Sequence, residues 1–171
     1  MKYYPFYLLL GALASFSCRS RIATQQLIQS HVDSTITLEE SATGLKAALS
    51  MNDSIASGSP LELSFAVINP SDSVQRFCKW HTPFEPFLSM YLDLKDDKGK
   101  PVAYIGAMAK RIMPPPADAY LSIPAGDTVR TLIDLRKGYD IKEPGTYHLV
   151  YRGQAMSGIE TANELDFVVV K

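Results

Sequence analysis

Apolar and polar residues alternate along most of the chain from Leu45 onward. In segments 45–51 and 60–69, every second residue is apolar, and the residues between them are mostly polar or small. The apolar positions are Leu45, Ala47, Leu49, Met51, Leu61, Leu63, Phe65 and Val67. A period of two is typical of a strand with one face in a core and the other in water. The pattern therefore predicts two strands at the start of this region.

The same reasoning predicts further short strands at 74–80, 88–95, 101–105, 120–123, 129–135, 146–152 and 165–170. In the second of these segments, we expect one shared face made of Leu88, Met90, Leu92 and Leu94. In 146–152, we expect one face of the strand to point outward and the other inward. The outward residues are Tyr147, Leu149 and Tyr151, and the inward ones are His148 and Val150. No segment has the apolar face of a helix of three turns.

Turn-forming residues separate these segments. Asn69–Asp72, Asp96–Gly99, Pro124–Asp127 and Glu143–Gly145 are rich in Asn, Asp, Pro and Gly, the residues that favour turns. Gly99 stands where a hairpin needs a positive φ. Turn signals roughly every 8–12 residues are typical of a sandwich. We therefore expect an all-β domain, an antiparallel immunoglobulin-like β-sandwich of about seven to nine strands.

A tyrosine near the end of the predicted domain fits this architecture. In immunoglobulin-like sandwiches, a late tyrosine hydroxyl often bonds back to the backbone at a sheet corner. Tyr147 and Tyr151 are the two candidates for this role. The alternative is that each is an ordinary half-buried strand residue.

The composition limits the size and the partners of the protein. The chain has 171 residues, of which 46% are hydrophobic and 20% charged, so it can build one domain with one core. Its formal net charge is −1. A nearly neutral chain has no electrostatic footprint for nucleic acid or for an acidic lipid surface, and we expect it to bind no nucleic acid.

The first 17 residues have the features of a targeting signal. Lys2 precedes an apolar run from Tyr7 to Ala14, which is shorter than the roughly 20 residues needed to cross a bilayer and fits a signal peptide. The run leads to the sequence Ser-Phe-Ser-Cys ending at Cys18, which is similar to a bacterial lipoprotein signal. We expect a lipoprotein signal peptide at 1–17 and a lipid on Cys18. A short amino-terminal anchor helix is the alternative.

The rest of the chain then divides into a polar tether at 18–42 and a β-domain at 43–171. The expected location is the bacterial cell envelope, with the lipid in the outer membrane and the domain facing the periplasm or the cell surface. Cys78 is the second of only two cysteines, so lipidation of Cys18 leaves it as a small buried hydrophobe. A Cys18–Cys78 disulfide in a secreted protein without lipid is the alternative.

Residues that carry chemistry are sparse. His31, His81 and His148 lie far apart, and neither a zinc-protease helix motif nor a Cys-x-x-Cys pair is present. The chain also lacks a nucleophile elbow and a phosphate-binding glycine loop. We expect no catalytic residue, no metal site and no cofactor, and therefore no enzyme.

The most unusual stretch runs from Met108 to Pro116. It combines two methionines and a Lys-Arg pair, which are adaptable contact residues, with three prolines that favour an extended backbone. We expect a partner-binding loop here, next to the aromatic segment 80–87. The candidate contact residues are Trp80, His81, Phe84, Met108, Lys110, Arg111, Met113 and Pro115. The alternative is a crossover whose prolines protect a sheet edge.

A series of short sequence pieces between residues 45 and 153 occurs in a recognisable order. The pieces are Lys79–Phe84, Tyr104–Gly106, Lys110-Arg111, Pro114, Tyr120, Pro124–Asp127, Asp134-Leu135, Tyr139-Asp140 and Gly145–Tyr147. This series resembles the amino-terminal β-domain of secreted lysine-specific (deuterolysin-like) metalloendopeptidases, and its most discriminating part is the combination of Tyr-Ile-Gly, Lys-Arg and Pro. The resemblance implies a fold, a secreted setting and an association with proteolysis. The family's His-Glu-x-x-His helix has no counterpart in this sequence, so no catalytic or metal residue is carried over.

The function predicted from these features is that of a non-catalytic, lipid-anchored binding module for a protein or peptide. A different hypothesis makes the domain a regulator or inhibitor of a secreted peptidase, or the accessory β-domain of a split metalloendopeptidase. A degenerate peptidase is a third hypothesis, against which the missing ligands argue. If Lys110 and Arg111 are contact residues, alanine at both positions weakens partner capture and leaves stability nearly unchanged.

Overall fold

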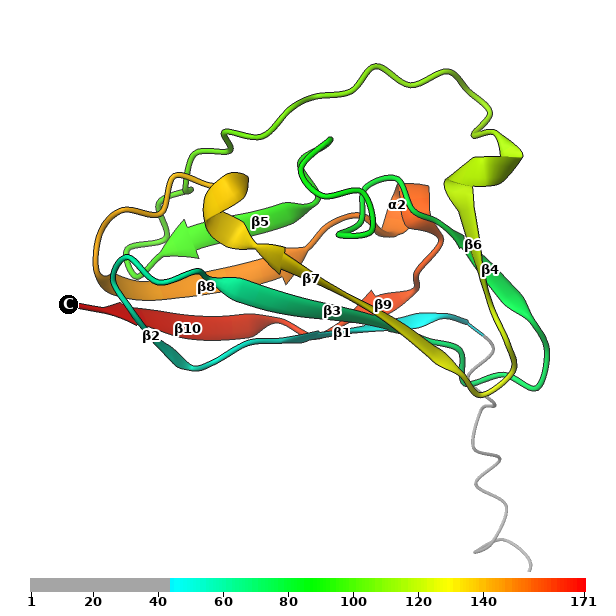
Figure 1. Ribbon diagram of the computed structural model, residues 1–171, viewed down its shortest axis with the longest axis horizontal. Helices are drawn as coiled ribbons and strands as arrows, with labels where there is room; N and C mark the ends of the chain where they lie inside the picture. The colour runs from blue at the N-terminus through cyan, green and yellow to red at the C-terminus, as the bar shows by residue number, and fades with distance from the viewer. Residues whose placement is uncertain (1–43) are drawn as a thin grey trace, which may run out of the picture. The chain divides into compact units, whose positions relative to one another are not determined.

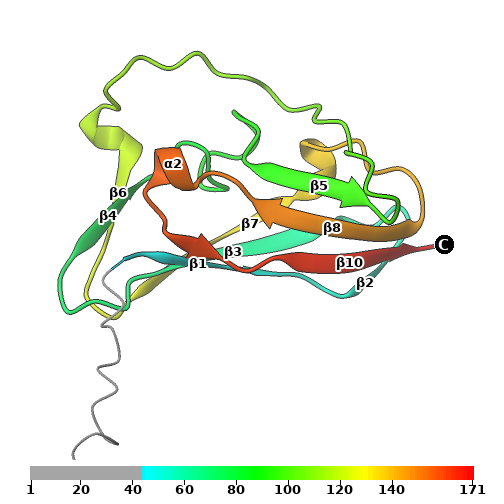
Figure 2. The ribbon, with the colours of Figure 1, turned by 180° about the vertical axis from the view of Figure 1, so that it is seen from behind.

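The computed structural model describes residues 44–171, which Figures 1 and 2 show from opposite sides. This part of the chain is mostly β-structure. Its strands are β1 (Lys46–Ser50), β2 (Ser54–Ala56), β3 (Glu62–Ile68), β4 (Gln75–Cys78), β5 (Leu92–Asp96), β6 (Tyr120–Ile123), β7 (Thr128–Asp134), β8 (Gly145–Tyr151), β9 (Thr161–Ala162) and β10 (Leu165–Val170). The helices are η1 (Ala117–Ala119), η2 (Leu135–Lys137) and α2 (Gln154–Ser157). The predicted signal peptide, Cys18 and tether lie outside the described residues.

The strands form three sheets. One four-stranded sheet has the order β7-β3-β1-β9, the other has the order β2-β10-β8-β5, and β4 pairs with β6 alone. Most neighbouring strands are antiparallel, but β1 pairs with β9 and β10 pairs with β2 in parallel. The expectation of a wholly antiparallel arrangement is therefore wrong at these two edges, where a strand of two or three residues is added after a crossover.

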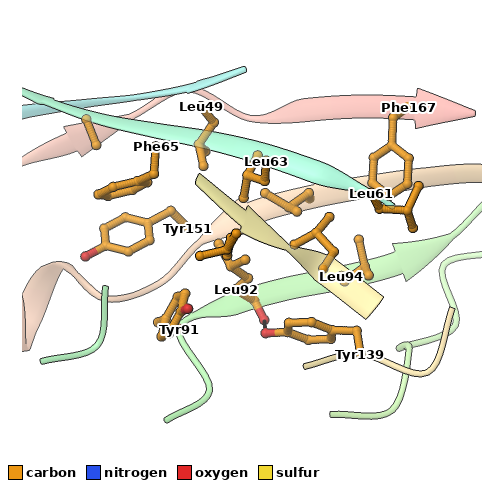
Figure 3. Close-up of a cluster of buried hydrophobic side chains, with 14 of the residues drawn as sticks. Leu49, Leu61, Leu63, Phe65, Tyr91, Leu92, Leu94, Tyr139, Tyr151 and Phe167 are labelled. Atoms are coloured by element: carbon orange, nitrogen blue, oxygen red, sulfur yellow. Dashed lines mark hydrogen bonds between the residues drawn. The ribbon is translucent and has the colours of Figure 1, made fainter. Parts of the chain in front are cut away.

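One hydrophobic core joins the two four-stranded sheets. It takes inward side chains from both, including Leu63 and Phe65 of β3 and Leu149 of β8, all fully buried. The ring of Phe65 lies 5.1 Å from the ring of Tyr151 between centroids, and Figure 3 shows the two rings facing each other from β3 and β8. The alternation predicted for 45–51 and 60–69 is confirmed, because the alternate apolar residues there point into this core.

The face of β8 that points into the core is the opposite of the predicted one. Tyr147, Leu149 and Tyr151 are buried, whereas His148 and Val150 are only half-buried. Alternation separates the two faces of a strand but does not by itself say which of them points inward. The larger aromatic set fills the space between the sheets, where its apolar area is removed from water.

Two predicted strands differ from the structure for reasons of local hydrogen bonding. The segment 88–95 begins as a strand only at Leu92, because the carbonyl oxygens of Phe87 and Leu88 accept hydrogen bonds from another part of the chain. The segment 101–105 makes only isolated bridges, Lys95 with Pro101 and Tyr104 with Tyr139. Pro101 has no N–H to donate to a ladder. The short strands β2 and β9 were not predicted.

The predicted turns are well supported. Gly99 and Gly126 have φ of 75° and 68°, the left-handed region that glycine adopts without steric cost. The side chain of Asp96 accepts the N–H groups of Lys98 and Lys100 at 3.0 and 2.8 Å, which closes the hairpin. The Tyr147 hydroxyl donates to the carbonyl oxygen of Glu143 at 2.7 Å, so the prediction of a tyrosine that bonds back to the backbone is confirmed for Tyr147.

Asn69 stabilises the corner formed by the β3–β4 connection and the β6–β7 connection. Its side chain is fully buried and its amide nitrogen donates to the carbonyl oxygens of Ser73, Ile123 and Pro124 at 2.7, 3.1 and 2.9 Å. Its amide oxygen accepts the N–H and the hydroxyl of Ser71. One side chain thus provides hydrogen-bond partners for backbone groups at this corner, where the pairing between strands is interrupted.

We expect Asn69→Ala to lower the free energy of unfolding by about 2–4 kcal/mol, because several buried carbonyl groups lose their donor. Asn69→Asp should cost at least as much, since a carboxylate would face those carbonyl oxygens. Urea denaturation measures both, with Asn52→Ala as the control at an exposed position. A loss below about 0.5 kcal/mol for both Asn69 variants would contradict this role.

Candidate functional site

The predicted partner-binding loop, Met108–Pro116, is part of a longer strap, which we define as residues 103–116. It starts after Val102, whose N–H donates to Leu94 of β5 at 2.9 Å, and it ends at η1. Figure 1 shows the strap as the long connection that runs from the β5 end of the molecule to η1 and β6. It contains no regular helix or strand. It passes over a second irregular segment, residues 79–91, which we call the 79–91 loop.

Backbone hydrogen bonds attach the first half of the strap. The N–H groups of Ile105, Ala107 and Ala109 donate to Gly138, Phe87 and Leu88 at 2.8, 2.9 and 2.9 Å. The donors therefore come from every second residue of the strap, as in an extended chain. The ring of Tyr104 packs edge-on against Tyr139, and its hydroxyl donates to the Ala107 carbonyl oxygen at 2.9 Å.

Arg111 fixes the second half of the strap to the 79–91 loop. Its guanidinium carbon lies 4.7 Å from the centroid of the Trp80 ring, within cation–π range, and its terminal nitrogen forms an ion pair with Glu85. The amine of Lys79 is 4.0 Å from the same carboxylate. The ion pair is largely shielded from solvent. Arg111 therefore joins the strap to both ends of the turn between Trp80 and Glu85.

The 79–91 loop has a strained but well-bonded backbone. His81 and Phe87 both have φ of 56°, a region that non-glycine residues adopt rarely and often near functional sites. The Thr82 hydroxyl donates to the Lys79 carbonyl oxygen at 2.6 Å. The Tyr151 hydroxyl donates to the His81 carbonyl oxygen at 3.1 Å, and burial raises the pKa of Tyr151 to about 12, so this donor stays protonated at neutral pH.

Large exposed hydrophobic side chains are concentrated here. Of the ten that the described residues contain, six belong to the strap and the 79–91 loop: Leu88, Met90, Ile105, Met108, Ile112 and Met113. Ile112 and Met108 are 86% and 71% exposed. Isolated exposed hydrophobic residues are normal, but a concentration on neighbouring segments is typical of interaction sites. We call these six residues the apolar strip.

The predicted contact residues fall into three groups. Met108, Lys110 and Met113 are exposed as expected; His81, Phe84, Arg111 and Pro115 are half-buried; Trp80 is buried. Phe84 packs on Phe65 and Phe77 with ring centroids 6.3 and 5.2 Å apart. Trp80 and Arg111 are not freely available to a partner, because each is the other's stacking partner. The pair has a structural role, because it joins the strap to the 79–91 loop.

Four members of the apolar strip were missed by the sequence analysis: Leu88, Met90, Ile105 and Ile112. Leu88 and Met90 continue the alternation of Leu92 and Leu94, and they were therefore assigned to a strand. Ile112 lies within the predicted loop Met108–Pro116 but is not among its candidate contact residues.

His148 belongs to a separate cluster of polar side chains. His148 lies 2.7 Å from Asp166 and 3.3 Å from Glu164 on the open face of its sheet. No group of three or more His, Cys, Asp or Glu side chains in residues 44–171 is arranged to hold a metal ion. Cys78 is free and 2% exposed, which confirms its expected burial. Within the same range, no helix is long and apolar enough to span a membrane.

Comparison with known proteins gives no relative that assigns a function. No protein-family model and no curated protein matches the chain. A β-glucosidase from Listeria innocua in complex with laminaribiose is 13% identical with a TM-score of 0.37, over 74% of this chain and 16% of the enzyme. An alkylpurine DNA glycosylase from Pseudomonas fluorescens bound to DNA is 15% identical with a TM-score of 0.39, over 88% and 38% of the two chains. The chain thus spans well under half of either enzyme, and likeness at this level assigns neither a family nor an activity.

We expect Arg111→Ala to lower the free energy of unfolding by about 1–3 kcal/mol, because it removes the stacking on Trp80 and leaves the Glu85 carboxylate without its closest cation. Arg111→Lys should recover only part of this loss, since an ammonium lacks the planar guanidinium. Lys110→Ala is the matched control, and we expect it to change the stability by less than about 0.5 kcal/mol. Equal effects at the two positions, measured by urea denaturation, would contradict the structural role of Arg111.

We expect His81 to make stability depend on pH in the range below 7. Partial burial, and secondarily the positive charge of Arg111, lower the pKa of His81. The unfolded chain then binds more protons than the folded one near the ordinary histidine pKa, so stability falls as the pH decreases from about 7 to 5. His81→Asn, which tolerates a positive φ, should show a shallower decrease. Parallel stability–pH curves for the two proteins would argue against this assignment.

Proposed function

We propose that this chain is an extracytoplasmic binding module that contacts a protein or peptide through the apolar strip. It is held at the bacterial cell envelope by a lipid on Cys18, as the sequence predicts, with the domain facing the periplasm or the cell surface. The β-sheets and the 79–91 loop act as a rigid support for the strap. No step of catalysis is part of this proposal.

We also propose that the domain is an immunoglobulin-like sandwich. Two sheets with the orders β7-β3-β1-β9 and β2-β10-β8-β5 enclose one core, and a parallel β2–β10 pair lies at an edge. The bond from Tyr147 to Glu143 supports this assignment, because a tyrosine at the equivalent corner is a feature of such folds. Domains with this architecture present loops at their ends for binding.

The main observation that supports the proposed function is the exposure of the apolar strip. Its members are exposed even though the strap is firmly attached by Arg111 and by three backbone hydrogen bonds. Methionine supplies three of the six positions, and its flexible, polarizable side chain adapts to varied partner surfaces. A surface of this kind buries apolar area when a partner covers it, which favours association.

The resemblance to peptidase β-domains remains a prediction, and with it the hypothesis of a regulator of proteolysis. A partner identified through the strap would also decide this point, since a peptidase among the partners would support the regulator and an unrelated protein would not. The first experiment therefore needs to report partner identity and contact position together.

A photo-crosslinking amino acid placed at position 108 or 113 of the full-length, membrane-anchored protein should give a discrete adduct with one envelope protein. The same substitution at Leu132 serves as the control, because that residue is equally exposed but lies on β7. Mass spectrometry identifies the partner, and the purified proteins should then bind with a micromolar or lower dissociation constant. Adducts of equal yield at Leu132, or none at the strap, would refute the proposed function.

A further inference from the structure

The strap has an unpaired backbone edge. The N–H groups of Ile105, Ala107 and Ala109 point toward the body of the domain and are hydrogen-bonded there. In an extended chain, the intervening N–H groups point to the opposite side. Those of Met108 and Lys110 have no hydrogen-bond partner among the described residues. The outer edge of residues 106–110 therefore offers backbone donors and acceptors to another chain.

The limits of this edge are set by the sequence. Before it, Tyr104 and Ile105 are tied to Tyr139 and Gly138. After it, Arg111 is fixed on Trp80 and Glu85, and Pro114–Pro116 have no N–H to donate. The edge is thus short, about five residues, which is the usual length of a strand. All its residues except Gly106 are exposed.

The charges around the edge leave one cation uncompensated. Glu85 pairs with Arg111 and Lys79, and Asp93 lies 3.6 Å from Lys95. Lys110 is exposed and has no carboxylate within ion-pair distance in the part of the chain that the structure describes. An added strand with an acidic residue near Lys110 would therefore gain a favourable cross-strand pair.

A second copy of the chain and a lipid surface fit this edge less well. A lysine on an open edge is a common feature that disfavours pairing of identical edges. The exposed hydrophobic side chains of residues 44–171 include no aromatic one, whereas aromatic residues mark membrane interfaces. One uncompensated lysine is also far fewer than the cluster of about four to eight cations that recognises anionic lipid.

We propose that the outer edge of residues 106–110 binds an extended, apolar segment of a partner protein by strand addition, with an acidic side chain of that segment facing Lys110. In this mode the backbone bonds supply affinity, and the side chains of Met108 and its neighbours supply selectivity. The proposal rests on the proposed function and adds to it the conformation and chemistry of the bound segment.

The decisive variant is Met108→Pro, which removes the outward N–H and keeps every inward hydrogen bond of the strap. Proline also favours an extended conformation in the residue before it, so the strap keeps its course. Met108→Ala is the matched control, because it removes the side chain and keeps the N–H. The probe is a fluorescent synthetic peptide of alternating valine and threonine with a glutamate at each end, titrated against the purified full-length protein.

We expect saturable binding of the probe, a loss of at least about tenfold with Met108→Pro, and a smaller loss of about threefold with Met108→Ala. Amide exchange of Met108 and Lys110 should slow when the probe is bound. Lys110→Glu should weaken binding of this probe and restore it for a probe with lysine at each end. The thermal midpoint of Met108→Pro should stay within about 3 °C of the wild type.

Other results would overturn the strand-addition proposal. They are no saturable binding up to about 1 mM peptide, equal losses for Met108→Pro and Met108→Ala, concentration-dependent dimerisation through the strap, or binding to anionic vesicles in place of the peptide. Strap-specific crosslinks that persist in Met108→Pro would also overturn it. In that case the proposed function stands, because the partner then binds by side-chain contacts alone.

Discussion

The contact between the inner faces of the two four-stranded sheets is the constraint on which the rest of the structure depends. Phe65 and Tyr151 meet across this interface, and the leucines around them are fully buried. A strand whose inward side chains fill such a space cannot shift its register by one residue without exposing all of them. The core therefore fixes both the alternation of each strand and the positions at which its loops leave the sheets.

A series of aromatic contacts fixes the position of the strap relative to this core. Tyr139 packs edge-on against Phe87 and Tyr104, and its hydroxyl donates to the Leu92 carbonyl oxygen at 2.6 Å. Burial raises the pKa of Tyr139 well above its usual range, so this donor remains protonated. Figure 3 shows this hydroxyl meeting the β5 backbone beside Tyr91. Aromatic side chains thus connect the buried leucines of β5 to Phe87 and to Tyr104 at the start of the strap.

The sequence predicted most strands because alternation is a local property that one sheet face imposes on a few residues. It did not predict β2 and β9, which are too short to show a period. It assigned the wrong inward face to β8, since alternation separates the two faces of a strand but does not say which one points into the core. The inward position of Arg111 could not be predicted either, because its partner Glu85 lies 26 residues away and only the folded chain brings them together. Exposed Met108 and Met113, by contrast, follow from the prolines and charges beside them.

The attachment of the strap also bears on the binding function that we propose for the apolar strip. A free loop of this length would lose about 1–2 kcal/mol of backbone entropy for each residue that a partner orders. Here Arg111 and the alternate N–H groups have already ordered the strap during folding, so the loss is offset by contacts within the domain. Under the proposed function, a partner would therefore meet a fixed surface, and a larger share of the apolar area that it covers would contribute to affinity.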